Sequence, residues 1–360
     1  MTLRWLILML VPSVAACSPQ AALQNPSSTN ANVPTSTTTT TIAPMVTSVS
    51  EPTPMASDLV WFAPNFGSRD YTDLFTKPEL WSETRVRINV FKFYTQNMLD
   101  QRCSICGGNT LKAFVEVDAF RQLNEWGIAI GIEVGAVKEW GCNGNETFRV
   151  ASTVIQNIKE NGGTVAFVDM DEPYIGGELV ANDQSCGYTM EQSANGTARF
   201  VQLMNSSYPN ILVGDTEPYP YFSVSELEQW IGALEDRDVT LAHFHLDVDM
   251  LQARSDNEDV FADLQTLSQF FQERHIPFGV ILTSNTNWAP NSDRAFFDAT
   301  MNWIRTVNAA LDKPQHVIFQ SWQGPSANGI HEFPINLPED DPDTYSLTRL
   351  VIEGLEMFEP

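Results

Sequence analysis

Eight short apolar segments recur along residues 58–360, and this repetition constrains the fold more than any other feature of the chain. Turn-forming residues bound each segment, and helical periodicity fills most of the intervals. The segments are 59–65, 85–91, 128–135, 164–172, 211–217, 240–249, 278–285 and 316–322. Strands that alternate with helices indicate a parallel sheet, and eight such units predict a single-domain (β/α)8 barrel, a TIM barrel. An open doubly wound sheet is the alternative, but no glycine-rich dinucleotide fingerprint follows the first strand.

Several intervals carry clear helix signals. Apolar residues recur at helical spacing in 147–163, 223–238, 294–311 and 345–358, and two glycines end the first of these ranges. The second opens with Ser223 and Glu226 at the spacing of a capping box. In a capping box each of the two side chains accepts a hydrogen bond from a backbone N–H group that the helix leaves free. We therefore expect a helix to begin at Ser223.

Strand alternation predicts which side chains enter the barrel. Helices cover the outside, so the apolar set of each strand faces them and the polar set faces inward. Most of the polar set falls late in the strands, at the rim where barrel enzymes keep their sites. The predicted inward residues are Arg87, Asn89, Glu133, Asp169, Asp171, Asp215, Glu217, His243, His245, Asp247, Asp249, Thr283, Asn285, Gln320 and Trp322. Asp169 lies too deep to touch a ligand, and a structural ion pair with Arg87 is expected for it.

An acidic rim with aromatic side chains suits the chemistry of sugars. Cleavage of a glycosidic bond needs one carboxylic acid to protonate the leaving oxygen and a second carboxylate as nucleophile or base. Crowding of carboxylates raises the pKa of one while its neighbour stays ionised. Aromatic rings stack on sugar rings, and several lie on or beside rim segments. The predicted substrate-binding residues are Asn89, Glu133, Asp171, Tyr174, His243, His245, Asp247, Asn285, Trp288 and Trp322.

Asp171, Glu172 and Pro173 end the fourth predicted strand, and this triplet resembles the Asn-Glu-Pro of the large clan of retaining (β/α)8 glycoside hydrolases. The resemblance implies that Glu172 is the general acid/base, and Trp322 is similar to the clan's sugar-platform tryptophan. The seventh strand has no glutamate where that clan keeps its nucleophile. Glu217 on the fifth strand is the predicted substitute, with Asp215, Asp247 and Glu133 as weaker candidates. The like charge of Asp171 is expected to raise the pKa of Glu172.

Two other functions remain open. His243 and His245 lie two apart on one strand, and with Asp171 or Glu217 they could hold a divalent metal in a metal-dependent hydrolase. Histidines in barrel sites also bind substrate hydroxyls, which needs no metal, so no metal or cofactor is expected here. A barrel whose carboxylate pair is degraded could instead bind glycan without cleaving it.

The first residues predict export. Arg4 precedes a short apolar stretch, 5–14, that is too short to span a bilayer permanently. Its end resembles a bacterial lipobox, which implies that Cys17 is lipidated. Residues 18–57 are rich in Ser, Thr and Pro and predict a disordered linker. We expect a monomer anchored to the outer membrane or cell surface, with the catalytic barrel at 58–360.

The remaining cysteines and the charge agree with an exported sugar-binding protein. Cys103, Cys106, Cys142 and Cys186 fall in loops after the second, third and fourth strands, and their even number predicts two disulfides there. Half of a zinc site at Cys103 and Cys106 is the alternative. A net charge of −25 disfavours binding to nucleic acid, which needs a basic surface.

Overall fold

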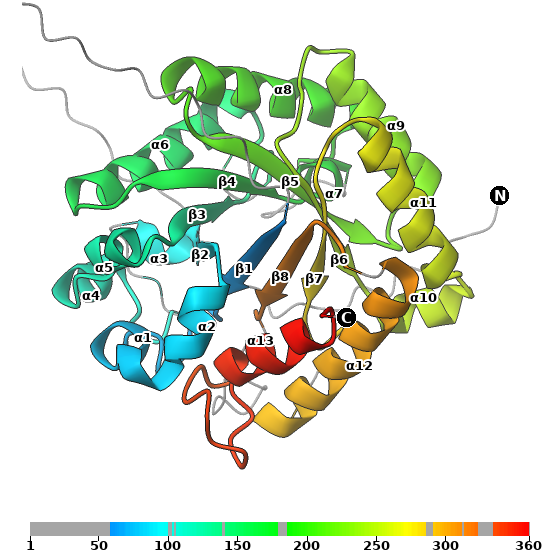
Figure 1. Cartoon of the computed structure of the whole chain (residues 1–360). Helices are drawn as coiled ribbons and strands as arrows, with labels where there is room; N and C mark the ends of the chain where they lie inside the picture. Colours follow the sequence, from blue (N-terminus) through cyan, green and yellow to red (C-terminus); the bar gives the residue numbers. More distant parts are fainter. Residues whose placement is uncertain are drawn as a thin grey trace, which may run out of the picture.

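The computed structural model describes residues 58–99, 103, 106–138, 141–178, 186–285, 291–311, 313–322 and 334–359. Eight parallel strands close into a barrel in chain order, with helices around it (Figure 1). The strands are β1 (Leu59–Ala63), β2 (Val90–Tyr94), β3 (Ala129–Val134), β4 (Val165–Asp171), β5 (Leu212–Tyr219), β6 (Phe244–Val248), β7 (Phe278–Leu282) and β8 (His316–Gln320). The predicted (β/α)8 barrel is therefore confirmed.

Helices follow each strand and form the outer layer. Within the described part of the chain they are α1 (Asp73–Thr76), α2 (Ser82–Arg87), α3 (Thr95–Met98), α4 (Leu111–Glu116), α5 (Ala119–Trp126), α6 (Gly144–Glu160), α7 (Pro173–Glu178), α8 (Met190–Ser207), α9 (Val224–Glu235), α10 (Met250–Asp256), α11 (Val260–Glu273), α12 (Asp293–Leu311) and α13 (Leu347–Glu356), with a 3₁₀ turn at Pro78–Trp81. The predicted capping box is present: the Ser223 hydroxyl accepts from the backbone N–H of Glu226, whose carboxylate accepts from that of Ser223.

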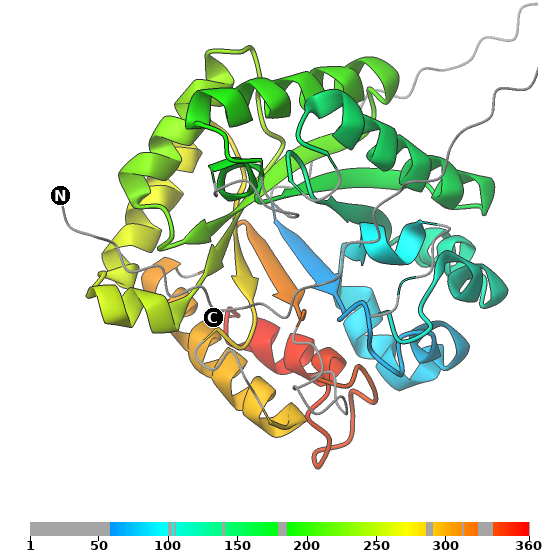
Figure 2. The same cartoon turned by 180° about the vertical axis from the view of Figure 1, so that it is seen from behind.

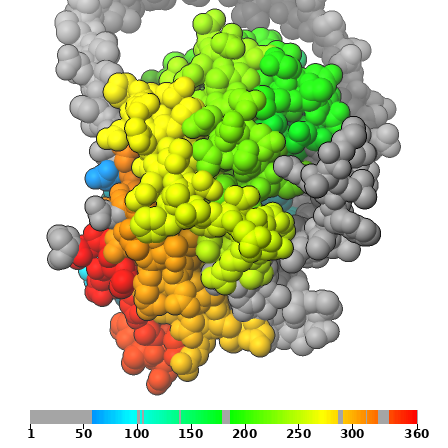
Figure 3. Space-filling model, turned by 90° about the vertical axis from the view of Figure 1, so that its right-hand side faces the viewer, coloured from blue at the N-terminus to red at the C-terminus, as the bar shows by residue number. Residues whose placement is uncertain are grey.

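The outer helices bury the apolar outer face of the barrel. Figure 2 shows the ring of strands from the opposite side, again enclosed by helices. From the side, the segments from α8 (green) through α11 (yellow) to α12 (orange) lie against one another (Figure 3). No helix among the described residues combines the length and the apolar composition that crossing a bilayer requires.

The barrel interior holds a cluster of aromatic and imidazole rings. The ring of Trp61 on β1 lies 5.1 Å from that of His243 and 5.0 Å from that of His245, between centroids. Glycines on neighbouring strands make the space. A Cβ on Gly214 would lie 2.1 Å from Nε2 of His243, and one on Gly279 would lie 2.7 Å from Cδ2 of His245. These glycines therefore identify the inward faces of β5 and β7.

The second strand differs from its prediction. Residues 85–87 end helix α2, where Arg87 pairs with Glu83 across one turn at 2.6 Å. The side chain of Asn89 lies before β2 and accepts a hydrogen bond from the backbone N–H of Val60. Arg87 and Asn89 were therefore placed wrongly, and Asn89 lies at the end of the barrel away from the rim. The polar residue that β2 sends inward is Lys92.

The fifth strand has the opposite orientation to its prediction. Gly214 and Thr216 face the interior, where the Thr216 hydroxyl lies 3.1 Å from each oxygen of Asp169. Asp215 and Glu217 face outward instead. Asp215 accepts a hydrogen bond from the Trp230 indole of α9 at 2.8 Å. Glu217 accepts one from the first turn of α7, at the backbone N–H of Tyr174, at 2.6 Å. Donors in the helix layer pair with both oxygens of Glu217 and with one oxygen of Asp215, which offsets part of the cost of burying these groups there.

Candidate active site

Four carboxylates gather at the C-terminal rim of the barrel. Glu133 ends the inward face of β3, Asp171 ends that of β4, and Asp247 lies on that of β6. Glu172 follows directly on β4. The Lys138 ammonium joins two of them, at 2.7 Å from Asp171 and 3.1 Å from Glu172. Asp171 and Glu172 keep 28% and 26% of their side-chain surface exposed, so both are accessible from the rim.

Glu172 has an unusual backbone conformation. Its φ angle is +53°, in the left-handed region that residues other than glycine rarely adopt. Its N–H donates to the carbonyl oxygen of Thr216 on β5, and its own carbonyl accepts from Gly176 of α7, both at 2.9 Å. Neighbouring strand and helix thus hold this conformation, which costs free energy and is enriched at functional sites.

A buried ion network lies beneath the rim. The Lys92 ammonium, fully buried, lies 2.6 Å from Glu133 and 2.9 Å from Asp169. Asp169 also lies 3.2 Å from Nε2 of His243. Asp169 is thus a deep structural residue, as predicted, but its cationic partner is Lys92 rather than Arg87. The network connects the rim at Glu133 with the interior of the barrel.

The predicted histidine pair belongs to this network. His243 and His245 both face inward, and each lies within 3.5 Å of the same Asp169 oxygen. Ligand atoms of these three residues lie within 4.8 Å of one another, a spacing that a metal ion would accept. The surroundings do not fit a dication, however, because the Lys92 ammonium and the Thr216 hydroxyl already contact Asp169. Glu217 cannot complete the ligand set, since it faces outward.

Burial and charge set the protonation of the rim. Burial raises the pKa of Glu133 to about 7, although Lys92 opposes the shift. Burial also raises the pKa of Glu172, with Lys138 lowering it and Asp171 raising it. The pKa of Asp247 lies well above its usual value because of burial and then the charges of Glu172 and Asp171. Three rim carboxylates therefore hold protons more firmly than in water.

Of the remaining predicted site residues, Trp322 and Asn285 lie at the C-terminal rim of the barrel, which is its mouth, and Tyr174 lies in the helix layer. Trp322 follows β8 and packs against the interior cluster around Trp61. The Asn285 side chain is buried just after β7. The ring of Tyr174 stacks on Phe222 at 3.8 Å in the helix layer with 2% of its surface exposed, so its prediction as a sugar-binding residue is wrong.

Asp249, which was predicted to face the barrel interior, instead caps helix α10, where its carboxylate accepts from the backbone N–H groups of Leu251 and Gln252. Trp288 and Cys17 lie outside the described residues.

Two lysines of the site were not predicted. Lys92 lies in the apolar run of β2, between Phe91 and Phe93, and Lys138 follows β3. Each contacts two carboxylates within 3.1 Å. A single lysine inside an aromatic strand was the available signal, because burial of an ammonium group requires a counter-charge nearby.

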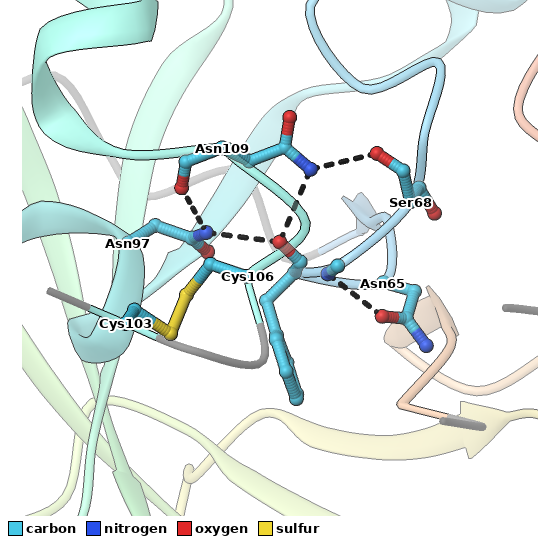
Figure 4. Close-up of a disulfide and its surroundings, with 8 residues drawn as sticks. Asn65, Ser68, Asn97, Cys103, Cys106 and Asn109 are labelled. Atoms are coloured by element: carbon cyan, nitrogen blue, oxygen red, sulfur yellow. Dashed lines mark hydrogen bonds between the residues drawn. A yellow bond between two sulfur atoms is a disulfide. The ribbon is translucent and has the colours of Figure 1, made fainter. Parts of the chain in front are cut away.

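Both predicted disulfides form in the rim loops. Cys142 before α6 bonds to Cys186 before α8, which joins the loops after β3 and β4. Cys103 bonds to Cys106 within the loop after β2. Beside that bond, the Asn97 amide donates to the carbonyl oxygen of Asn109 at 2.6 Å, and the Asn109 amide donates to that of Ser68 at 2.7 Å (Figure 4). The second of these hydrogen bonds joins the loop after β2 to the loop after β1.

Comparison with known proteins extends to the fold and no further. No protein-family model matches the chain, and no curated protein sequence matches it. Among solved structures, a GH5_18 protein from Streptomyces cattleya in complex with Manb1-4GlcNAc is similar over 84% of this chain and 81% of its own, with a TM-score of 0.52 and 9% identity. The GH53 catalytic domain of Ignisphaera aggregans covers 82% of this chain and 92% of its own, with a TM-score of 0.49 and 13% identity. The first likeness supports the barrel fold.

Proposed function

We propose that the protein is a glycoside hydrolase in which Asp247 and Glu172 form the acid and base pair. The observation that carries the proposal is the convergence of these carboxylates on one rim, where the charge of Glu172 acts on the pKa of Asp247. Two carboxylates that interact in this way do not ionise together, so one donates a proton while the other stays charged. Glycosidic cleavage requires that division of roles.

The surroundings decide which carboxylate holds the proton. Lys138 contacts Glu172 at 3.1 Å and favours its ionised form. Among the described residues no cation contacts Asp247, and its Oδ1 atom is buried without a hydrogen-bond partner. Glu172 therefore ionises first, and Asp247 keeps its proton at higher pH. This assignment gives Glu172 the role of base or nucleophile, and it replaces Glu217, which faces away from the rim.

In the proposed reaction, Asp247 protonates the glycosidic oxygen as the bond to the anomeric carbon breaks. Glu172 either attacks that carbon, which forms a glycosyl ester that water then hydrolyses while the ionised Asp247 takes a proton from that water, or it removes a proton from a water molecule that attacks the carbon directly. In both routes water supplies the new hydroxyl group and the released sugar keeps the proton from Asp247. Retention follows from direct attack and inversion from attack by water.

The test compares Asp247→Asn with Glu172→Gln on two kinds of substrate. On a polysaccharide, both variants should lose about 10²–10⁴ in rate, the usual contribution of a general acid or base. An aryl glycoside with an activated leaving group needs little protonation, so Asp247→Asn should retain most activity on it and Glu172→Gln should not. The reverse pattern would return the acid role to Glu172.

Glu217→Gln is the matched control, because the amide oxygen can still accept from the backbone of Tyr174. It should keep wild-type activity on both substrates. Equal losses in Glu217→Gln and Glu172→Gln would contradict the proposed pair. A wild-type protein that binds polysaccharide without cleaving it would be a glycan-binding protein, and the proposal would be wrong.

A further inference from the structure

Unpaired polar atoms lie on the β6 and β7 side of the barrel mouth. Asp247 and Thr283 each follow an inward residue by two positions, His245 and Ile281, so alternation turns both toward the interior. Asp247 Oδ1 and Thr283 Oγ1 are buried without a hydrogen-bond partner among the described residues. Both amide atoms of the fully buried Asn285 also lack one. An unpaired buried polar atom costs about 1–3 kcal/mol, so each is a candidate for pairing with a ligand.

The strand register places this group beside the carboxylates. Leu282 of β7 pairs with Phe319 of β8, so Thr283 lies next to Gln320. The Gln320 amide donates to Glu133 at 3.0 Å. On its other side Gln320 pairs with Ala63 of β1, whose methyl group fills little of the mouth. Hydroxyl and amide groups therefore lie on the β7 and β8 side of the rim, where β7 is the neighbour of β6 and its proposed acid, Asp247.

Both lysines near the mouth already contact carboxylates of the protein. Lys92 contacts Glu133 and Asp169, and Lys138 contacts Asp171 and Glu172, all within 3.1 Å. These four carboxyl groups outnumber the two ammonium groups, and Asp247, which the proposed reaction keeps protonated, adds no positive charge. A sugar that carries its own carboxylate would meet net negative charge there, which disfavours its binding by like-charge repulsion. A hydroxyl-bearing neutral ring meets no such penalty.

We infer that Asp247, Thr283 and Asn285 form a hydroxyl-binding subsite, and that the substrate is an uncharged glycan rather than a polyuronate. The inference rests on the proposed function and specifies its substrate class. An amide offers one donor and one acceptor side by side, which matches two neighbouring hydroxyls of a sugar ring. The Thr283 hydroxyl can donate or accept beside it.

The experiment uses pairs of polysaccharides that differ only in oxidation at C6, such as cellulose with its C6-oxidised form, polyglucuronate, and a β-linked mannan with β-linked polymannuronate. Binding and cleavage by the wild-type chain are measured on both members of each pair. At least one neutral member should be bound, and its oxidised partner should not. Thr283→Val keeps the shape and removes the hydroxyl, and it should weaken binding of the neutral member about tenfold, the effect of one lost hydrogen bond.

Thr300→Val is the matched control, because the Thr300 hydroxyl is buried in α12 and bonds to the carbonyl oxygen of Phe296. It should leave binding unchanged. Thr283→Val should not lower the melting temperature, since its hydroxyl has no partner to lose, so weaker binding would not reflect unfolding. Binding of an oxidised member, or equal affinity in the two valine variants, would overturn the inference. Cleavage of a polyuronate would contradict the inferred substrate class and support the proposed hydrolase. Binding of a neutral glycan without cleavage would support the inferred substrate class and contradict the proposed hydrolase.

Discussion

Lys92 is the residue that makes a charged barrel interior possible. Burial alone would raise the pKa of Asp169, but the ammonium of Lys92 and the two histidines hold that pKa well below its usual value. Burial lowers the pKa of Lys92, but the carboxylates of Asp169 and Glu133 raise it above its ordinary value. Each group therefore stays ionised only because its partner does, and loss of one partner leaves an uncompensated charge.

Lys92→Met should lower the free energy of unfolding by about 3–5 kcal/mol, because it leaves Asp169 and Glu133 buried without their cation. Lys112→Met is the matched control, since Lys112 is 84% exposed and its Glu116 pair lies at 3.6 Å. Such a surface pair contributes about 0–1 kcal/mol. Urea unfolding of both variants measures the difference. Equal midpoints would show that the buried network adds no stability.

Glu133 should make the stability of the barrel depend on pH. Its folded pKa of about 7 lies above the ordinary value of 4.5, so the folded state binds the proton more tightly than the unfolded state. The resulting stability is present below pH 4.5 and is lost as the pH rises through about 7. His245, with its pKa lowered to about 4 mainly by burial, has the opposite effect below pH 6.5.

The measurement is therefore the difference in unfolding free energy between the wild type and Glu133→Gln, taken from pH 4 to 8, which cancels the histidine effect. This difference should fall as the pH rises across the window. A flat or rising difference would contradict the raised pKa.

At the scale of elements, strand periodicity predicted the orientation of side chains correctly in the strands whose polar residues face the barrel interior. In β3, β4 and β6 the polar residues face inward, and Glu133, Asp171 and Asp247 were placed correctly. In β5 the same rule failed because the partners of Asp215 and Glu217, the Trp230 indole and the first turn of α7, come from the helix layer. Strand periodicity carries no information about such partners, since they lie on other elements of the fold.

The two disulfides should contribute unequal stability. Cys142 and Cys186 are 44 residues apart, whereas Cys103 and Cys106 are three apart. A longer closed loop restricts the unfolded chain more, which gives about 4 kcal/mol for the first bond and about 2 kcal/mol for the second. Denaturation of the two double-serine variants should show this order. Equal losses would mean that local contacts, such as those of Asn97 and Asn109, outweigh loop length.

At the scale of the whole molecule, the barrel closes on itself without any residue before Asp58. β1 pairs with β8 from Leu59↔His316 to Ala63↔Gln320, and the Leu59 N–H donates to the carbonyl oxygen of Gln315. Every strand therefore has two neighbours within 59–320. A repeat of eight strand and helix units was enough to predict this closure, and the closure in turn brings residues from β3, β4 and β6 to one rim.

Because the barrel closes in this way, attachment to a membrane and folding should be separable. Cys17→Ser removes the predicted lipidation site, so the protein should move from the membrane fraction to the soluble fraction. Its melting temperature should equal that of the barrel alone, residues 58–360, because the described core uses no earlier residue. Fractionation of expressing cells with detection by antibody measures the first effect, and thermal unfolding measures the second. The Cys103→Ser, Cys106→Ser variant is the control: it also replaces cysteines, which form a disulfide in the wild type, but keeps Cys17, and it should stay with the membrane. If Cys17→Ser remains membrane-bound, the lipid anchor predicted from the sequence is wrong.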